Sequence, residues 1–288
     1  MFEGAHTAIA TPFNRNGSVD YGKLRDLVEF QIAGGISGLV PVGTTGESPT
    51  LDYAEHEKVI EETIRVANRR VKIIAGTGGN STAEALELTK HAKAAGADAT
   101  LQVTPYYNRP SQAGLIKHFN AVADLGLPVV LYNVPGRTGR DIAVETVVEL
   151  VKHPKIVAMK EAGGSADRVS QYLARCKIEV LSGDDSLTLP MMILGATGVI
   201  SVASNVAPRP VSDLVAHALA GRWKEARELH YKLYRLFTDL FIDTNPVPVK
   251  AALAMMGKME ETYRLPLCET TEANKKKIAE CLRELKLI

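Results

Sequence analysis

Eight short apolar runs, each followed by a helical pattern, constrain the fold of this 288-residue chain most strongly. Several runs are rich in Val and Ile and lack polar alternation, as expected of strands that are buried on both faces of a parallel sheet. Successive runs begin roughly 20–35 residues apart, which leaves room for a helix between neighbouring strands. The predicted strands are Thr7–Thr11, Gly38–Val42, Val71–Ala75, Ala99–Val103, Val129–Tyr132, Ile156–Lys160, Glu179–Ser182 and Gly198–Val202.

Local signals at the ends of the helical segments agree with this alternation. Ser81 and Glu84 have the spacing of a capping box, which predicts the start of a helix. Three other helical segments are followed by a glycine, at Gly34, Gly96 and Gly126. Glycine favours the left-handed backbone conformation that often ends a helix.

Eight strand–helix units in about 220 residues are the number that a closed (β/α)8 TIM barrel requires. A doubly wound open sheet is the alternative, but neither a GxGxxG nor a GxxxxGKS/T nucleotide turn is present. After Pro208 the pattern is helical only, over Trp223–Phe241, Val247–Met256 and Thr271–Leu287. We therefore expect an α/β chain with a barrel domain over 1–222 and a C-terminal helical domain over 223–288.

Composition narrows the classes of partner. The net charge is +1 with no charged block, which argues against nucleic acid or an anionic membrane surface as a partner. The uncharged stretch Ser186–Pro208 is interrupted by Pro, Gly and Asn, so it predicts a helix and a strand rather than a membrane span. The N-terminus lacks the pattern of a signal peptide. Three cysteines without metal-clip spacing predict reduced thiols in the cytoplasm.

Lys160 is the most unusual residue at the carboxyl end of a predicted strand, where a barrel places its active site. It ends the apolar run Ile156–Met159, although burying an ammonium group is costly. Burial disfavours the charged form and exposes the amine lone pair, which is what imine formation with a carbonyl requires. A strand-end lysine that reaches water or pairs with Glu161 is the alternative, and position alone does not separate the two.

Other strand ends supply residues that would complete such a site. Tyr132 ends the neighbouring strand and can relay protons, or it can be an ordinary core tyrosine. Thr44 and Thr45 form a turn whose hydroxyls and N–H groups suit a carboxylate, or they are a helix cap. Arg137 can bind a second carboxylate bidentately, or it can be a solvated loop residue.

Asp184 and Asp185 follow the seventh predicted strand. No histidine or carboxylate has the spacing of a partner ligand, so we expect helix caps rather than a metal site. Two aspartates after Gly183 also argue against a phosphate-binding barrel.

Three motifs in one order resemble a known family over most of the chain, from about Ala5 to the C-terminal helices. They are Gly43-Thr-Thr-Gly-Glu47, Tyr132-Asn-Val-Pro-Gly-Arg-Thr-Gly139 and the strand that ends at Lys160. They resemble the dihydrodipicolinate synthase family, part of the pyruvate-dependent class I aldolase superfamily that includes N-acetylneuraminate lyase. The resemblance implies condensation of pyruvate with L-aspartate 4-semialdehyde in lysine and diaminopimelate biosynthesis, without a cofactor or metal, by a homotetramer built as a dimer of dimers.

The resemblance also implies roles for individual residues. Lys160 forms the imine with pyruvate, and Tyr132, Thr44 and Tyr107 form a proton relay, with Tyr107 donated across a dimer interface. Thr45 binds the pyruvate carboxylate, and Arg137 stands at the entrance of the site. The remaining substrate-binding positions are Gly183 and the Ile200 carbonyl. Arg137 favours an acidic second substrate over the sugar of N-acetylneuraminate lyase. That lyase or a keto-deoxy sugar acid aldolase is the alternative enzyme, and a non-catalytic barrel that only binds a keto acid is the other alternative.

A regulatory site for L-lysine is the last implication of the resemblance. The matching positions are Ser48, Leu51, His56, Asn80, Glu84 and Tyr106. Pro49 and Tyr53 depart from lysine-sensitive relatives, and the capping-box spacing offers Glu84 a purely structural role. We hold feedback inhibition by lysine as a hypothesis.

Overall fold

Eight parallel strands close into a barrel in the computed structural model of the protein, which describes residues 1–288. Their order around the barrel follows the chain, and β8 pairs with β1. Closure requires glycine at Gly198, because a Cβ there would lie 1.9 Å from the carbonyl oxygen of Gly4. The strands are β1 Gly4–Ala8, β2 Gly38–Val40, β3 Lys72–Gly76, β4 Ala99–Val103, β5 Val129–Asn133, β6 Ile156–Glu161, β7 Glu179–Ser182 and β8 Gly198–Ser201. The predicted TIM barrel is confirmed.

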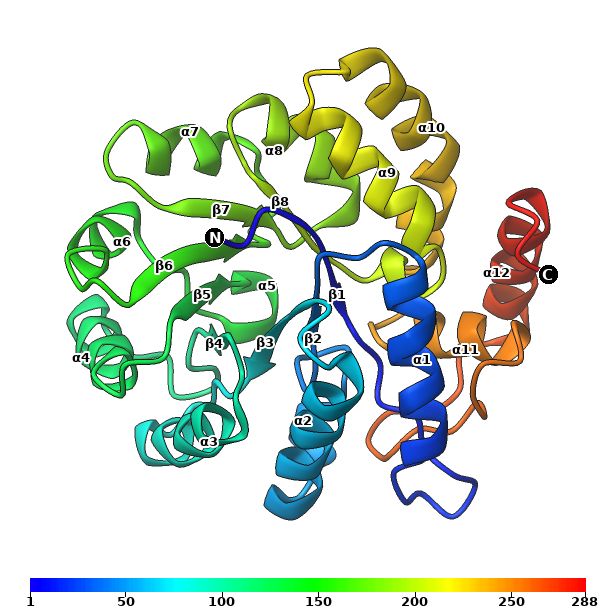
Figure 1. Ribbon diagram of the computed structural model, residues 1–288, viewed down its shortest axis with the longest axis horizontal. Coiled ribbons are helices and arrows are strands. Elements are labelled where there is room, and N and C mark those ends of the chain that lie inside the picture. The colour runs from blue at the N-terminus through cyan, green and yellow to red at the C-terminus, as the bar shows by residue number, and fades with distance from the viewer.

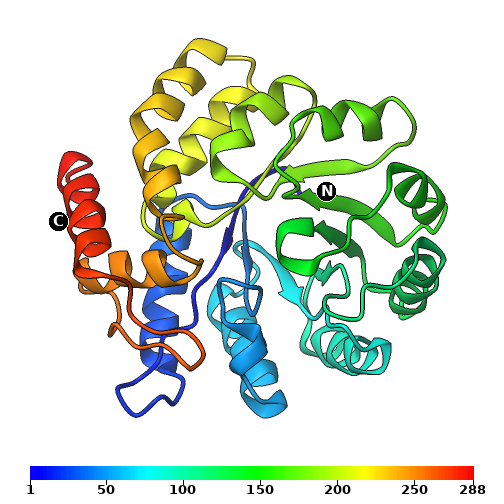
Figure 2. The same ribbon diagram turned by 180° about the vertical axis from the view of Figure 1, so that it is seen from behind.

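Helices surround this barrel, and Figures 1 and 2 show them as a ring around the central strands. The helices of the ring are α1 Tyr21–Ala33, α2 Tyr53–Ala67, α3 Thr82–Ala95, α4 Gln112–Ala123, α6 Val144–Leu150, α7 Asp167–Leu173, α8 Thr188–Ile193 and α9 Pro208–Leu219. The one-turn helix α5 Pro135–Thr138 lies inside this ring, directly after β5 (Figure 1). Three further helices follow: α10 Trp223–Asp239, α11 Val247–Met255 and α12 Glu272–Glu284. Short 3-10 turns are η1 Ser48–Thr50, η2 Asp185–Leu187 and η3 Ala203–Asn205.

The first two strands end earlier than the apolar runs predict. The β1 strand stops at Ala8, and the Ala10 N–H donates to the side-chain Oδ1 of Asn205 instead of continuing a ladder. The β2 strand stops at Val40 because Pro41 has no N–H to donate. After each of these two strands the backbone turns across the carboxyl end of the barrel. The early strand ends therefore leave room for loops at that face.

The signal at Gly34 is wrong in detail, and the helix start predicted at Ser81 is confirmed without the complete capping box. Gly34 has an ordinary right-handed conformation, with φ −72°, and Gly35 takes the left-handed one instead. Ser81 caps α3 by accepting from the Glu84 N–H, but the complete capping box forms at α2, between Asp52 and Glu55. The left-handed glycine at Gly96 is confirmed.

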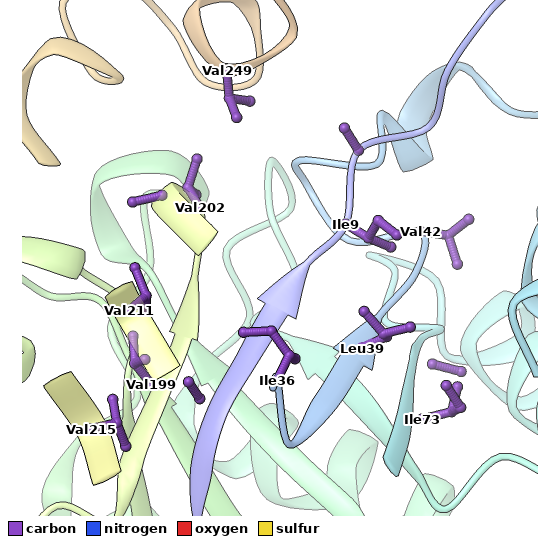
Figure 3. Close-up of a cluster of buried hydrophobic side chains, with 14 of the residues drawn as sticks. Ile9, Ile36, Leu39, Val42, Ile73, Val199, Val202, Val211, Val215 and Val249 are labelled. Atoms are coloured by element: carbon purple, nitrogen blue, oxygen red, sulfur yellow. The ribbon is translucent and has the colours of Figure 1, made fainter. Parts of the chain in front are cut away.

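The core has two layers, and the alternation of each strand decides which layer a side chain enters. Val130 and Tyr132 of β5 point into the barrel, whereas Val129 and Leu131 face the helices. Figure 3 shows part of the outer layer, where Val199 of β8 lies near Val211 and Val215 of α9, and Leu39 of β2 lies near Ile73 of β3. The inner layer stops short of the carboxyl end, where polar side chains replace it.

Of the last three helices, α10 and α11 pack on the barrel, and α12 packs on these two. Helix α10 contacts α9 along its length, and α11 contacts η3 and α12. Val249 of α11 joins the same buried cluster as Val202 and Ile9 (Figure 3). The uncharged segment 186–208 is divided among short elements, namely most of η2, then α8, β8 and η3. None of the helices combines the length and the apolar character needed to cross a bilayer.

Candidate active site

A cavity of about 410 Å³ opens at the carboxyl ends of the strands. Six of the residues that the sequence singled out line it: Thr44, Thr45, Tyr132, Arg137, Lys160 and Gly183. They come from the ends of β2, β5, β6 and β7, so the fold brings together residues that are up to 139 positions apart in the chain. This is the place where barrel enzymes carry their active sites.

Lys160 is buried in this cavity without an acidic partner. It pairs in register with Tyr132, so both side chains point inward, and its Nζ lies 4.1 Å from the centroid of the tyrosine ring. Glu161 follows on the opposite face, where its carboxylate accepts from the Tyr172 hydroxyl at 2.6 Å and from Asn133. Pairing with Glu161 is therefore excluded as the reason for a lysine at this position.

Hydroxyl groups surround the lysine amine. Tyr132 is only 6% exposed, and its hydroxyl has no hydrogen-bond partner in the chain; the same is true of the Thr44 hydroxyl. Both are therefore free to bond a substrate. Tyr107 does not join them: it is 91% exposed, lies outside the cavity and has a left-handed backbone, with φ 69°. One chain thus assembles three of the four predicted catalytic residues.

The Thr44–Thr45 turn is shaped as an anion site. The Thr44 carbonyl accepts from the Glu47 N–H at 3.1 Å, but the N–H groups of Thr44 and Thr45 donate to nothing within the chain. Free N–H groups at a turn attract a carboxylate. Thr45 is 2% exposed, and its Oγ1 accepts a hydrogen bond from Asn245 Nδ2 at 3.0 Å.

Arg137 stands at the mouth of the cavity on the one-turn helix α5. Its Nη2 donates to the backbone carbonyl of Asn245 at 3.2 Å, and no carboxylate neutralises it. The guanidinium group therefore keeps most of its donors for an acidic ligand.

Gly183 is required beside the lysine. A Cβ at this position would lie 2.7 Å from Ala162 Cβ and 3.0 Å from Lys160 Cε, so a larger residue would displace the lysine chain. Ile200 differs from the other predicted site residues. Its side chain is fully buried in the inner layer of the barrel, and it does not line the cavity.

The two aspartates after Gly183 have separate structural roles. Asp184 caps η2 by accepting from the Ser186 N–H at 3.1 Å, as predicted. Asp185 does not cap the helix that follows it, which corrects the prediction: its carboxylate accepts from Ser201 Oγ and from the N–H groups of Val202 and Ala203. Burial raises the pKa of Asp185. No group of three His, Cys, Asp or Glu side chains is arranged to hold a metal ion.

The C-terminal segment supplies residues that the sequence did not indicate. Asn245, Phe237 and Phe241 complete the cavity wall. Lys250 of α11 forms a fully buried ion pair with Glu47, at the end of the Thr-Thr turn. Glu47 ends the motif that begins at Gly43, but Lys250 and Asn245 belong to no motif and lie about 200 residues from their partners. The only signal in the sequence was the single charge in the apolar segment Val247–Met256.

A second cavity, of about 210 Å³, adjoins the first across Thr44, Tyr132 and Arg137. Ser48 and Tyr106 of the predicted lysine site line it. Leu51 is 9% exposed, and Asn80 and Glu84 lie at the start of α3; none of the three lines this cavity. Burial, with Glu84 as a smaller cause, raises the pKa of Tyr106. His56 is buried, both ring nitrogens lack partners, and burial lowers its pKa to about 4.

Comparison with known proteins agrees with this geometry. Residues 1–285 match the model of the Dihydrodipicolinate synthetase family. The chain belongs to this family. It is 55% identical to the 4-hydroxy-tetrahydrodipicolinate synthase of Geotalea daltonii, over 100% of both chains. The family places it among the pyruvate-dependent lyases of the class I aldolase type, which confirms the predicted enzyme class.

Two solved structures share its fold closely. The dihydrodipicolinate synthase of Acinetobacter baumannii, complexed with pyruvate, is 46% identical over 100% of both chains, with a TM-score of 0.98. The enzyme of Cyanidioschyzon merolae, with lysine bound, is 38% identical over 100% of this chain and 99% of that one, with a TM-score of 0.96. These similarities favour the synthase over the alternative lyases.

Proposed function

We propose that this chain is a 4-hydroxy-tetrahydrodipicolinate synthase that condenses pyruvate, bound to Lys160 as a Schiff base, with L-aspartate 4-semialdehyde. The observation that carries the proposal is a buried lysine without an acidic partner, beside a turn with free N–H groups. An amine and an anion site in one cavity match the ketone and the carboxylate of a 2-oxo acid. The pyruvate complex of the Acinetobacter relative supports the same substrate.

The first half of the reaction forms the imine. The neutral Lys160 amine attacks C2 of pyruvate while the Thr44–Thr45 turn holds the carboxylate. The carbinolamine then loses water, and the Tyr132 hydroxyl, with Thr44, moves the protons that this loss requires. The imine withdraws electrons from C3, so a C3 proton leaves and an enamine forms.

The second half joins the two substrates. The enamine C3 attacks the aldehyde carbon of aspartate semialdehyde, which makes the new carbon–carbon bond and restores the imine. The amine of the second substrate then attacks C2 and displaces Lys160, which closes the ring. Arg137 places this substrate by binding its carboxylate at the cavity mouth, and Gly183 keeps space beside the lysine chain. The Ile200 carbonyl is the remaining family position, at the end of β8.

A steady-state assay tests the substrate assignment. We expect turnover with pyruvate and aspartate semialdehyde and none with N-acetylneuraminate or 2-keto-3-deoxygluconate. Arg137→Ala should raise KM for the semialdehyde at least tenfold, since a charge-assisted bidentate contact is lost, but leave imine formation intact. Equal loss of both steps would contradict the role of Arg137.

Feedback inhibition by L-lysine is a second proposal, at the second cavity. Ser48 and Tyr106 line it, and Glu84 offers a carboxylate that does not complete a capping box. The relative from Cyanidioschyzon merolae has lysine bound, which supports lysine as a ligand of this chain. Titrating L-lysine should lower the rate at millimolar concentration, and Glu84→Gln should weaken this effect without changing uninhibited turnover. A rate that is unchanged at millimolar lysine would contradict the proposal.

We also propose a homotetramer and a cytoplasmic location. Tyr107 is almost fully exposed in one chain, which suits donation to the site of a partner, and Leu173, Ile193 and Leu194 expose apolar surface on α7 and α8. All three cysteines are free thiols, as expected in a reducing compartment. Sedimentation velocity at several concentrations tests the assembly, and a monomer at all of them would contradict it.

A further inference from the structure

Asn245 touches both residues that hold the substrate carboxylates in the proposed function. It lies in the loop between α10 and α11 and is 6% exposed. Its side-chain Nδ2 donates to Thr45 Oγ1 at 3.0 Å, and its backbone carbonyl accepts from Arg137 Nη2 at 3.2 Å. A single residue of the C-terminal segment therefore connects the pyruvate turn to the entrance arginine.

The direction of the Asn245–Thr45 bond determines what the hydroxyl can do. A threonine hydroxyl has one hydrogen to donate and accepts on its lone pairs. Because Oγ1 already accepts from Asn245, its own hydrogen points elsewhere, and no acceptor within the chain uses it. The hydrogen is thus available to a carboxylate in the cavity, and the bond from Asn245 polarises the O–H and strengthens the donation.

A buried ion pair fixes Asn245 in this position. Lys250, five residues further on, pairs with Glu47, two residues after Thr45, and both side chains are 0% exposed. The backbone N–H of Arg264 also donates to Glu47, at 3.3 Å. The turn 43–47 and the segment 245–250 are therefore joined twice, by the Asn245–Thr45 hydrogen bond and by the Lys250–Glu47 ion pair. The ion pair keeps the Asn245 amide at hydrogen-bond distance from the Thr45 hydroxyl.

We propose that Asn245 is a positioning residue that directs the Thr45 hydroxyl toward the carboxylate of pyruvate. This inference rests on the proposed function, because that function places the carboxylate at Thr45. Asn245 itself takes no part in the chemistry. It acts through Thr45, so its contribution should disappear when the threonine hydroxyl is removed.

The test is borohydride trapping of pyruvate on the full-length protein over a range of pyruvate concentrations. Asn245→Ala should raise the half-saturating concentration about fivefold to tenfold and leave the maximal trapped fraction unchanged. Thr45→Val should have a similar effect, and the double variant should be no worse than Thr45→Val alone. Asn274→Ala is the matched control, since Asn274 donates a similar bond to Thr270 at 2.9 Å in the same C-terminal segment, away from the cavity. It should trap like the unmodified protein.

Asn245→Asp provides a second test that keeps the side-chain shape. A carboxylate offers only acceptors, so it would draw the Thr45 hydrogen away from the cavity and repel the substrate. Its half-saturating concentration should therefore exceed that of Asn245→Ala. Equal effects of the Asp and Ala variants, or an Asn245→Ala effect that persists undiminished in the Thr45→Val background, would overturn the inference. Absence of trapping in the unmodified protein would instead refute the proposed function.

Discussion

At the scale of single residues, two buried lysines have opposite surroundings and opposite roles, one in the structure and one in the proposed chemistry. Lys250 is held by Glu47, so its charge is compensated, although burial lowers its pKa. Lys160 has a tyrosine ring at 4.1 Å and no carboxylate. The amine of Lys250 is therefore occupied by its ion pair, whereas the amine of Lys160 is free to react with a carbonyl carbon.

Gly183→Ala tests how closely Lys160 must fit. The added Cβ would meet Lys160 Cε at 3.0 Å and Ala162 Cβ at 2.7 Å, so we expect imine formation to slow at least tenfold. The measurement is the rate of borohydride trapping with pyruvate. Gly136→Ala is the control at the same end of the barrel, because a Cβ there meets no atom within 4 Å. Equal rates for the two variants would contradict this packing.

At the scale of elements, the sequence predicts what is local and misses what is distant. The eight strands, and the lysine at the end of β6, could be predicted from the apolar runs. A strand that is buried on both faces has apolar residues at successive positions, so each run is visible in the sequence. The end of β1 was missed because the distant residue Asn205 decides it. The end of β2 is an exception, since its signal is local: Pro41 stops the strand, although the apolar run continues to Val42. Asn245 and Lys250 were missed because their partners are about 200 residues away, and no periodicity encodes such a contact.

The Lys250–Glu47 pair joins α11 to the turn after β2, and we expect Lys250→Met to lower the free energy of unfolding by about 3–5 kcal/mol. The loss arises because the variant leaves the Glu47 carboxylate buried and alone. A Glu47→Gln, Lys250→Met double variant should regain part of it, since no charge remains. Urea unfolding measures these changes.

Lys258→Met is the control for that prediction. Its amine lies 3.7 Å from the centroid of the Phe30 ring near the surface, so its loss should cost about 1 kcal/mol or less. A Lys250→Met variant that is no less stable than Lys258→Met would show that the buried pair does not hold α11 in place.

At the scale of the whole molecule, three buried histidines make stability depend on pH. Burial lowers the pKa of His6, His56 and His118 from 6.5 to about 4 in each case. Between pH 4 and 6.5 the unfolded chain therefore binds protons that the folded chain does not, and stability falls as the pH drops through this range. The slope should be roughly 1.4 kcal/mol per pH unit for each histidine.

His56→Gln measures one part of this slope. The variant should reduce the pH dependence of the free energy of unfolding between pH 4.5 and 6 by up to roughly 1.4 kcal/mol per pH unit, since it removes one buried histidine whose pKa is lowered. Unfolding by urea at several pH values gives the slope. An unchanged slope would mean that His56 is protonated in the folded protein.

The proposed donation of Tyr107 between chains is also a property of the assembly. Lys160→Ala and Tyr107→Ala should each be nearly inactive alone. Mixed dimers refolded from both variants should regain activity, because one site then combines an intact Lys160 with the Tyr107 of the other chain. Without recovery on mixing, Tyr107 would have to act within its own chain, where it is 91% exposed and outside the cavity.

The central claim is that Lys160 carries the substrate, and borohydride reduction with pyruvate followed by peptide mass mapping tests it most directly. Lys160 is 6% exposed in the cavity without a partner, whereas Lys250 is buried in an ion pair with Glu47. We therefore predict a single reduced pyruvate adduct, on the peptide that contains Lys160. An adduct on Lys250 or any other lysine, or no adduct at all, would contradict the account.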